Sequence, residues 1–338
     1  MSAPAPSMFS AAAVQVAERL GLAQGQPNLV AFADTLLELA RQDRNVLVVT
    51  SDSRGSGKLG SFAKELPQRL VEVGIAEQNL VGIAAGLASA GKSVFAVSPA
   101  CFLTARSLEQ IKNDVCYSDH PVSLVGISAG VSYGALGSTH HSLHDLAALR
   151  AINNIDIVVP ADNWETVAAV RAAAKHPRPL YLRFGKASMY DLPAGGADFT
   201  IGRSRQLRDG NDVAFVATGE TVIHGLLAAA ELATQGIESR VLSIHTVKPL
   251  DEAAVLAAAR DCRSIVTVEE HMAHGGLGEA CASLLLRHGM ATAFHSVGIP
   301  DEYTVTGSQA DLVRHDGITR EGLVDTAQSL LERAEVPA

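Results

Sequence analysis

Residues 73–88 read Val-Gly-Ile-Ala-Glu-Gln-Asn-Leu-Val-Gly-Ile-Ala-Ala-Gly-Leu-Ala and place a single carboxylate, Glu77, at the start of an otherwise apolar helical pattern. An ionised carboxylate is costly to bury without a partner, so a glutamate in these surroundings indicates a specific interaction. Gly82 and Gly86 lie inside the same predicted helix, where each costs about 1 kcal/mol relative to alanine. The stretch therefore predicts a buried carboxylate on a helix that packs closely against another element.

Short apolar segments alternate with helical periodicity on both sides of this stretch. Val46–Thr50, followed by Ser-Asp-Ser, is typical of a buried parallel strand. Such an alternation predicts an α/β fold with two open, mostly parallel, doubly wound sheets, the second smaller than the first. The expected strands are 46–50, 69–73, 93–97, 122–127, 155–159, 180–183, 213–217, 239–244, 264–268 and 294–297. The expected helices cover 29–41, the segment from 77, 104–116, 140–150, 164–175, the segment ending at 234, 251–259, 277–288 and 320–333.

The pattern is interrupted over residues 184–210, which contain Gly185, Pro193, Gly195 and Gly196 among many polar groups. Glycine and proline clusters of this kind favour a linker. The sequence before the first apolar strand predicts a loosely ordered extension with one helix at Ala11–Leu20. We therefore divide the chain into an N-terminal extension (1–27), a first domain (28–190), a linker (191–210) and a second domain (211–338).

Composition excludes several classes of protein. The 338 residues carry a formal net charge of −9, whereas a general nucleic-acid binder needs a basic face. The four cysteines stand singly, without a Cys-x-x-Cys pair, which is typical of reduced thiols in a cytoplasmic protein. The N-terminus has no basic residue before an apolar run, unlike a signal peptide, and no apolar run reaches the roughly 18 residues of a membrane span.

Three local motifs allow alternative interpretations. Gly55-Ser-Gly-Lys-Leu-Gly60 matches a dinucleotide-binding pattern, but Pro67 leaves room for only a short helix, so a loop is favoured. His140 and His144 are spaced like zinc ligands on one helix face. Two alternatives are open: the segment is a polar helix start capped by Ser142, or an imidazole lines a cleft at the edge of a sheet. The glycine-rich segment 269–279 either holds an anion or forms a simple strand-to-helix turn.

Arg183 ends a predicted strand in Leu-Tyr-Leu-Arg-Phe-Gly. A guanidinium at the carboxyl end of a strand can bind a phosphate through two hydrogen bonds. The alternative is an ordinary surface ion pair.

Several segments, in this order, resemble the transketolase family. The resemblance covers about residues 30–330. It rests on the stretch from Val73 to Gly86, Phe102 with Ala105–Ile111, Gly137-Ser-Thr-His140, Val159-Pro-Ala-Asp162, Leu182-Arg183, Val247-Lys-Pro-Leu-Asp251 and the segment from Val268 to Gly278. It implies that the first domain is a pyrimidine-binding domain and that the second is the transketolase C-terminal domain.

The resemblance also implies thiamine diphosphate chemistry. In such enzymes a glutamate, here Glu77, hydrogen-bonds a ring nitrogen of the aminopyrimidine and favours the tautomer that removes the thiazolium proton. By the same resemblance, Phe102 stacks on the pyrimidine and Ile75 contacts the cofactor. His140 contacts the cofactor or the substrate hydroxyls and is, with Glu77, a predicted catalytic residue. Arg183 binds a sugar phosphate.

One part of the family pattern is missing. The family anchors the diphosphate through Mg²⁺ held by a Gly-Asp-Gly…Asn motif in another domain, and no Gly-Asp-Gly occurs here; Arg208-Asp-Gly-Asn211 is not a credible match. The resemblance therefore implies the C-terminal subunit of a split transketolase, inactive alone, whose N-terminal partner subunit brings the diphosphate and Mg²⁺ site. A heterotetramer with self-association across the pyrimidine-binding domain is expected.

The sugar end of the site departs from the family. Leu136 stands where the family has an aspartate that contacts a sugar hydroxyl, Ser128 replaces a histidine, and Pro99 replaces a phenylalanine. Asp52, just after the first strand, is a further substrate-binding candidate. Because losing a hydrogen-bond acceptor changes substrate preference, these departures make a donor other than the ordinary pentose phosphates plausible.

The sequence thus predicts an enzyme subunit that transfers a two-carbon ketol unit from a ketose, expected to be phosphorylated, to an aldehyde. A 2-oxoacid dehydrogenase β subunit and a deoxyxylulose-phosphate-synthase-like enzyme are alternatives within the same chemistry. A non-catalytic binding or regulatory homologue is the alternative from another class, and the presence of Glu77 and Phe102 argues against it.

Overall fold

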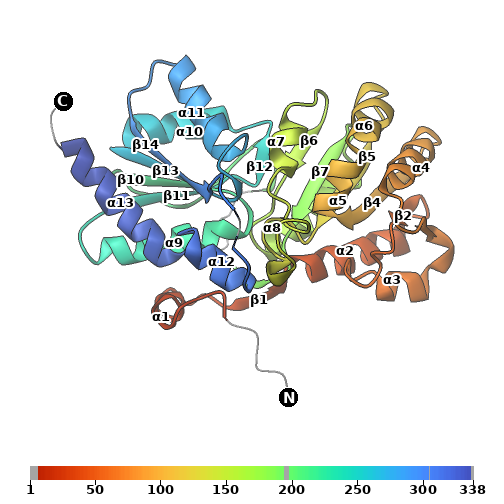
Figure 1. The fold of residues 1–338 in the computed structure, drawn as a ribbon, viewed down its shortest axis with the longest axis horizontal. Helices are drawn as coiled ribbons and strands as arrows, with labels where there is room; N and C mark the ends of the chain where they lie inside the picture. The colour runs from red at the N-terminus through yellow and green to blue at the C-terminus, as the bar shows by residue number, and fades with distance from the viewer. Residues whose placement is uncertain (1–6, 194–197, 304, 336–338) are drawn as a thin grey trace.

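Two β-sheets lie side by side in the computed structural model, which describes residues 7–193, 198–303 and 305–335 (Figure 1). The larger sheet has the strand order β12 (Thr246–Lys248), β6 (Asp156–Val158), β7 (Leu180–Phe184), β5 (Val122–Ile127), β4 (Ser93–Pro99), β2 (Val46–Thr50) and β3 (Leu70–Glu72). The smaller sheet has the order β14 (Ala293–Ile299), β13 (Ser264–Met272), β10 (Val213–Ala217), β11 (Ser239–Ser243) and β9 (Arg205–Arg208). The predicted α/β class with two mostly parallel sheets is confirmed.

Helices cover both faces of the larger sheet, because its strands are apolar on both sides. One face is covered by α4 (Glu77–Ser89), α5 (Ala100–Arg106), the π-helical turn after it (Ile111–Tyr117) and α7 (Asp145–Arg150). The other face is covered by α2 (Asn28–Gln42), α3 (Gly60–Glu65) and α8 (Asn163–Ala173).

The smaller sheet is covered in the same way. One face packs against α1 (Ala11–Arg19), α9 (Val222–Ala233), α12 (Gln309–His315) and α13 (Arg320–Glu335). The opposite face packs against α10 (Glu252–Asp261) and α11 (Leu277–Arg287). Among the described residues, none of the helices is both long and apolar enough to cross a membrane.

Two predicted helices differ in the structure. The segment 104–116 is not one helix: α5 ends at Arg106 and is followed by α6 (Leu108–Gln110) and the π-helical turn. The break lies at Ser107, whose hydroxyl donates to the Leu103 carbonyl, a local bond that competes with helical hydrogen bonding. The helix expected from 140 begins only at Asp145, because Ser142 instead forms a bridge to Gly130; Ser142 is therefore not its N-cap.

The N-terminal extension is not loose over its described residues. Ser10 caps α1 by accepting a hydrogen bond from the Ala13 N–H at 3.0 Å, and α1 buries Ala13 and Val16 against the second domain. The next segment, β1 (Gln24–Pro27), pairs with β8 (Ser188–Tyr190) in a small antiparallel sheet. The extension thus connects the two halves of the chain.

The predicted linker and the second domain also contribute strands that were not predicted. The end of the predicted linker forms β9, which pairs with β11. The three-residue strand β12 comes from the second half of the sequence but pairs antiparallel with β6 at the edge of the first sheet. Each sheet therefore has one antiparallel edge strand, and the two predicted domains share a continuous framework.

Burial of Phe9 gives a prediction for stability. Phe9 is buried against Tyr190 and His224, so Phe9→Ala is expected to lower the free energy of unfolding by about 3 kcal/mol in a denaturant titration. Gln15→Ala, on the exposed face of α1, serves as the control and is expected to change it by less than about 0.5 kcal/mol. Equal effects of the two substitutions on the free energy of unfolding would contradict the packing of Phe9 against the second domain.

Candidate active site

The candidate residues gather at the carboxyl edge of the larger sheet. Asp52 follows β2, Glu77 lies shortly after β3, Phe102 follows β4 within α5, and His140 lies in the loop after β5. Parallel strands present their carboxyl ends at one edge, which is where open α/β sheets bind ligands.

Glu77 is the first residue of α4 and only 4% exposed. The Arg106 Nη1 donates to both carboxylate oxygens, at 3.0 Å to Oε1 and 3.1 Å to Oε2. The N-terminal end of a helix also favours a negative charge. The predicted buried carboxylate is therefore present, and its partner is Arg106, four residues after Phe102 on the same short helix.

A continuous row of rings and cations extends from this carboxylate. The Arg106 guanidinium lies 4.3 Å from the centre of the Phe102 ring, and the His140 ring packs edge-on against Phe102 with 5.3 Å between centroids. The other neighbour of His140 is Tyr133, at 5.4 Å, and the Lys186 ammonium lies 4.4 Å from the Tyr133 ring centre. Three predicted residues thus lie in one row.

Arg106, Tyr133 and Lys186 are members of this row that were not predicted as site residues. Burial raises the pKa of Tyr133, and burial together with the nearby Lys58 lowers the pKa of Lys186. A signal for Arg106 existed, because residues four apart on a helix share a face and Phe102 was already a candidate. For Lys186 the signal was its position just beyond the strand that ends with Phe184.

The other predicted residues differ in their accessibility. Ile75 is 75% exposed beside Glu77, and Leu136 is 55% exposed in the loop that carries His140. Asp52 is exposed and has a left-handed backbone with φ 48°. Ser128 also has a left-handed backbone, with φ 56°, but its side chain is fully buried and does not line an open surface.

Arg183 is not an open phosphate ligand in this structure. The residue is 6% exposed, and its Nε donates to the Asp145 carboxylate at 2.8 Å. The Nη2 donates to the carbonyls of Ser142 and Glu270 at 3.1 and 3.0 Å. Burial alone would raise the pKa of Asp145, but Arg183 and the neighbouring His271 hold it below its ordinary value. Arg183 therefore lies in a buried ion pair, not in the surface pair of the alternative interpretation, and its contact with a sugar phosphate stays a prediction.

The fold also shows the surroundings of the alternative motifs. The glycine pattern 55–60 leads into a helix of only six residues, as expected for a loop. The segment after β13 is a strand-to-helix turn. The Glu269 carboxylate accepts hydrogen bonds there from the N–H groups of Leu277 and Gly278, at 2.7 and 2.8 Å. A side chain of this protein thus occupies the position at the helix start where an external anion would bind. Among the described residues, no three His, Cys, Asp or Glu side chains are grouped as metal ligands.

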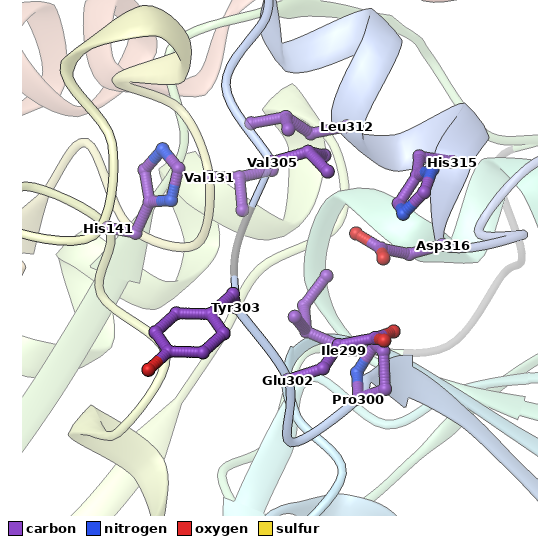
Figure 2. A pocket seen from close by; sticks show the side chains of 10 residues that line it. All are labelled: Val131, His141, Ile299, Pro300, Glu302, Tyr303, Val305, Leu312, His315 and Asp316. Carbon is purple, nitrogen blue, oxygen red and sulfur yellow. The ribbon is translucent and has the colours of Figure 1, made fainter.

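A cavity separates the His140 loop from the second domain. Its volume is only about 20 Å³, and Figure 2 shows His141 on the wall opposite His315 and Asp316, with Tyr303 between them. A neighbouring cavity of about 380 Å³ shares His141 and Tyr303 and adds His144. The loop is therefore covered by the second domain on the side of His141.

The outer side of α4 lacks the close neighbour that its glycines predicted. Within the described chain, a Cβ added at Gly82 or Gly86 would meet no heavy atom within 4 Å. Any element that packs closely on this side must come from outside these residues.

Comparisons with known proteins agree with this geometry. The family model of the transketolase pyrimidine-binding domain matches residues 27–190, and that of the transketolase C-terminal domain matches residues 202–323. Over 303 residues the chain is 46% identical to a subunit of the apulose-4-phosphate transketolase of Phocaeicola vulgatus, covering 89% of this chain and 96% of that protein. Over 302 residues it is 35% identical to a 6-deoxy-6-sulfo-D-fructose transketolase subunit of a Clostridium species, covering 89% and 94%.

A solved structure described as a split gene transketolase, inactive β4 tetramer, superposes with a TM-score of 0.82 at 34% identity and covers 91% of this chain and 99% of that one. The chain belongs to the transketolase family, which confirms the resemblance. Within that family it is similar to subunits that carry the pyrimidine-binding and C-terminal domains as a separate polypeptide.

The Arg183–Asp145 pair gives a prediction with a defined pH dependence. Asp145→Asn leaves a buried cation unpaired and is expected to lower the free energy of unfolding by about 3–5 kcal/mol at pH 7. Because the folded pKa of Asp145 lies below the ordinary 3.8, this contribution is complete above that value and is lost as the pH falls through the folded pKa.

The measurement is denaturant unfolding at several pH values. Glu38→Gln, which removes the exposed pair with Arg171, is the control and is expected to cost less than about 1 kcal/mol. A deficit for Asp145→Asn that grows below pH 4 would contradict this assignment.

Proposed function

We propose that this chain is the subunit of a thiamine diphosphate-dependent transketolase that carries the catalytic glutamate, and that the complex transfers a two-carbon ketol unit from a ketose to an aldehyde. The observation that carries the proposal is the buried Glu77 carboxylate at the carboxyl edge of the larger sheet, linked through Arg106 to the rings of Phe102 and His140.

The residues present fit the aminopyrimidine end of the cofactor. Each Glu77 oxygen accepts one hydrogen bond from Arg106, and a carboxylate oxygen can accept two, so capacity for a ring N–H is left. Phe102 and the exposed Ile75 offer apolar surface for a flat ring. Stacking on Phe102 requires the half-exposed Arg106 side chain to yield the ring face that it covers.

Each residue then has a defined task. Thiamine diphosphate supplies the carbon nucleophile when bound. Glu77 holds the proton at the pyrimidine ring nitrogen, which is general acid–base work by a positioned carboxylate. His140, held between Phe102 and Tyr133, presents its imidazole to substrate hydroxyls. Lys186, at the far end of the row over the Tyr133 ring, is a further cation that can contact the phosphate of the substrate.

The remainder of the site is assigned to a partner. We propose that an N-terminal transketolase subunit with a Gly-Asp-Gly…Asn motif supplies the Mg²⁺ and diphosphate site, and that the chain also self-associates across its pyrimidine-binding domain. The exposed Ile75 and the open glycines of α4 support a contact with another polypeptide at this edge. The tetramer of the related split transketolase supports self-association.

The substrate end favours an unusual ketose. Leu136 gives the His140 loop an apolar side chain where the family has an acceptor, and two similar proteins are named for apulose-4-phosphate and 6-deoxy-6-sulfo-D-fructose. We propose a phosphorylated or similarly anionic ketose as donor, with Lys186 as the anion contact.

The first test is Glu77→Gln in the complex with the proposed N-terminal subunit. The substitution keeps the shape but removes the anionic acceptor, so kcat/KM for ketol transfer is expected to fall about 10²–10⁴-fold with the fold intact. Glu109→Gln, a nearby exposed carboxylate, is the control and is expected to leave kcat/KM unchanged. Full activity in Glu77→Gln would refute the proposed mechanism.

A second test concerns substrate preference. Leu136→Asp places an acceptor on an exposed position of the loop, so the ratio of kcat/KM for a ketopentose phosphate donor to that for apulose-4-phosphate is expected to rise about tenfold. Ala135→Asp, one position away, is the matched control. No change in the ratio of kcat/KM values would show that this position does not determine the donor.

A further inference from the structure

The loop that carries His140 contains a structural problem. Residues 130–142 include Gly130, Gly134 and Gly137, all with positive φ, and such glycines add conformational freedom that ordering the loop must overcome. Yet His140 must be held in one place to act on a substrate, because small misplacements are costly in catalysis.

The beginning of the loop is held by the second domain. Glu270, a buried residue of β13, accepts a hydrogen bond from the Val131 N–H at 2.7 Å through its Oε1. The Gln309 side chain, at the start of α12, donates to the same carboxylate at 3.2 Å. The approach is close: a Cβ at Gly130 would lie 2.3 Å from the Glu270 Oε1.

The end of the loop is held through the same residue. Arg183 Nη2 donates both to the Ser142 carbonyl and to the Glu270 carbonyl. The Ser142 N–H donates to the Gly130 carbonyl at 2.8 Å and so closes the loop on itself. Glu270 therefore contacts the first part of the loop with its side chain and its last part, through Arg183, with its main chain.

The middle of the loop also faces the second domain. A Cβ at Gly134 would lie 2.7 Å from the Gly307 carbonyl oxygen, just before α12. His141 Nε2 donates to the Gly134 carbonyl at 2.8 Å and lies on the wall of the cavity in Figure 2. The next residue back, His140, packs instead against Phe102 and Tyr133. The two sides of the loop thus contact different domains.

We propose that Glu270 is a positioning residue: it holds loop 130–142 so that His140 meets the substrate, and the C-terminal domain acts in catalysis through this clamp. The inference rests on the proposed function for its kinetic part. Cofactor contacts at Glu77 and Phe102 lie outside the loop, so the clamp affects substrate binding and turnover while leaving thiamine diphosphate affinity unchanged.

The experiment compares four variants of the complex. Glu270→Ala removes the acceptor of the Val131 hydrogen bond. Gly130→Ala adds a Cβ that clashes with the Glu270 carboxylate and so pushes the loop away from it. Glu270→Gln keeps an acceptor oxygen for Val131 and is the conservative rescue. Glu269→Ala is the matched control, because this neighbouring carboxylate accepts its hydrogen bonds from the N–H groups at the start of α11 and not from the loop.

The first readout is amide hydrogen exchange of residues 130–142. We expect exchange to become about tenfold faster or more in Glu270→Ala and Gly130→Ala, and to stay as in the wild type in Glu270→Gln and Glu269→Ala. Unchanged exchange in both Glu270→Ala and Gly130→Ala would overturn the clamp. This readout does not depend on activity, so a wild-type complex without ketol transfer would refute the proposed function and not the clamp.

The second readout is kinetic. We expect Glu270→Ala to lower kcat/KM about 10–100-fold with a higher substrate KM and an unchanged thiamine diphosphate Kd. If Glu270 only stabilised the fold, Glu270→Ala would lower cofactor affinity and activity together. Glu269→Ala shows the effect of losing a buried carboxylate that does not contact the loop. Faster loop exchange with unchanged kcat/KM would overturn the catalytic part of the inference.

Discussion

The buried guanidinium of Arg183 is the group on which the arrangement of this molecule depends. A buried cation costs several kcal/mol unless its donors are satisfied, so its partners cannot separate freely. Those partners are the first residue of α7 (Asp145), the last residue of the His140 loop (Ser142) and a strand residue of the other sheet (Glu270). One side chain therefore determines the relative position of three elements and joins the two sheets.

The candidate site depends on this junction on one side and is open on the other. The row from Glu77 to Lys186 is held within the chain by Arg106, Phe102, His140 and Tyr133. Beside Glu77, however, Ile75 is exposed and the glycines of α4 face open space. In our proposal this open half is where a partner subunit and the diphosphate end of the cofactor complete the site.

Much of the fold could be predicted from periodicity, because apolar runs such as Val46–Thr50 have few alternatives to a buried strand. The three-residue strand β12 could not, since so short a segment has no period and is ordered by its pairing with β6. In the N-terminal extension the helix expected at Ala11–Leu20 is confirmed, but its packing against the second domain was missed, although Phe9, Ala13 and Val16 have the spacing of one helix face.

The candidate site, like the fold, has parts that the sequence could predict and parts that it could not. Glu77 was found because a lone carboxylate in an apolar pattern is costly, a signal that is local in sequence. The burial of Arg183 was not predicted, because a strand-terminal arginine has the same local pattern whether it faces a ligand or a buried carboxylate. Its partner, Asp145, lies 38 residues away in the sequence, so only the fold could decide between the two.

The measurement that tests the central claim most directly is a calorimetric titration of thiamine diphosphate with Mg²⁺, on this chain alone and on the chain copurified with the proposed N-terminal transketolase subunit. The account predicts tight binding only in the presence of the partner, because this chain supplies the pyrimidine end of the site and not the diphosphate end. Tight binding to the chain alone, or no binding in either sample, would contradict it.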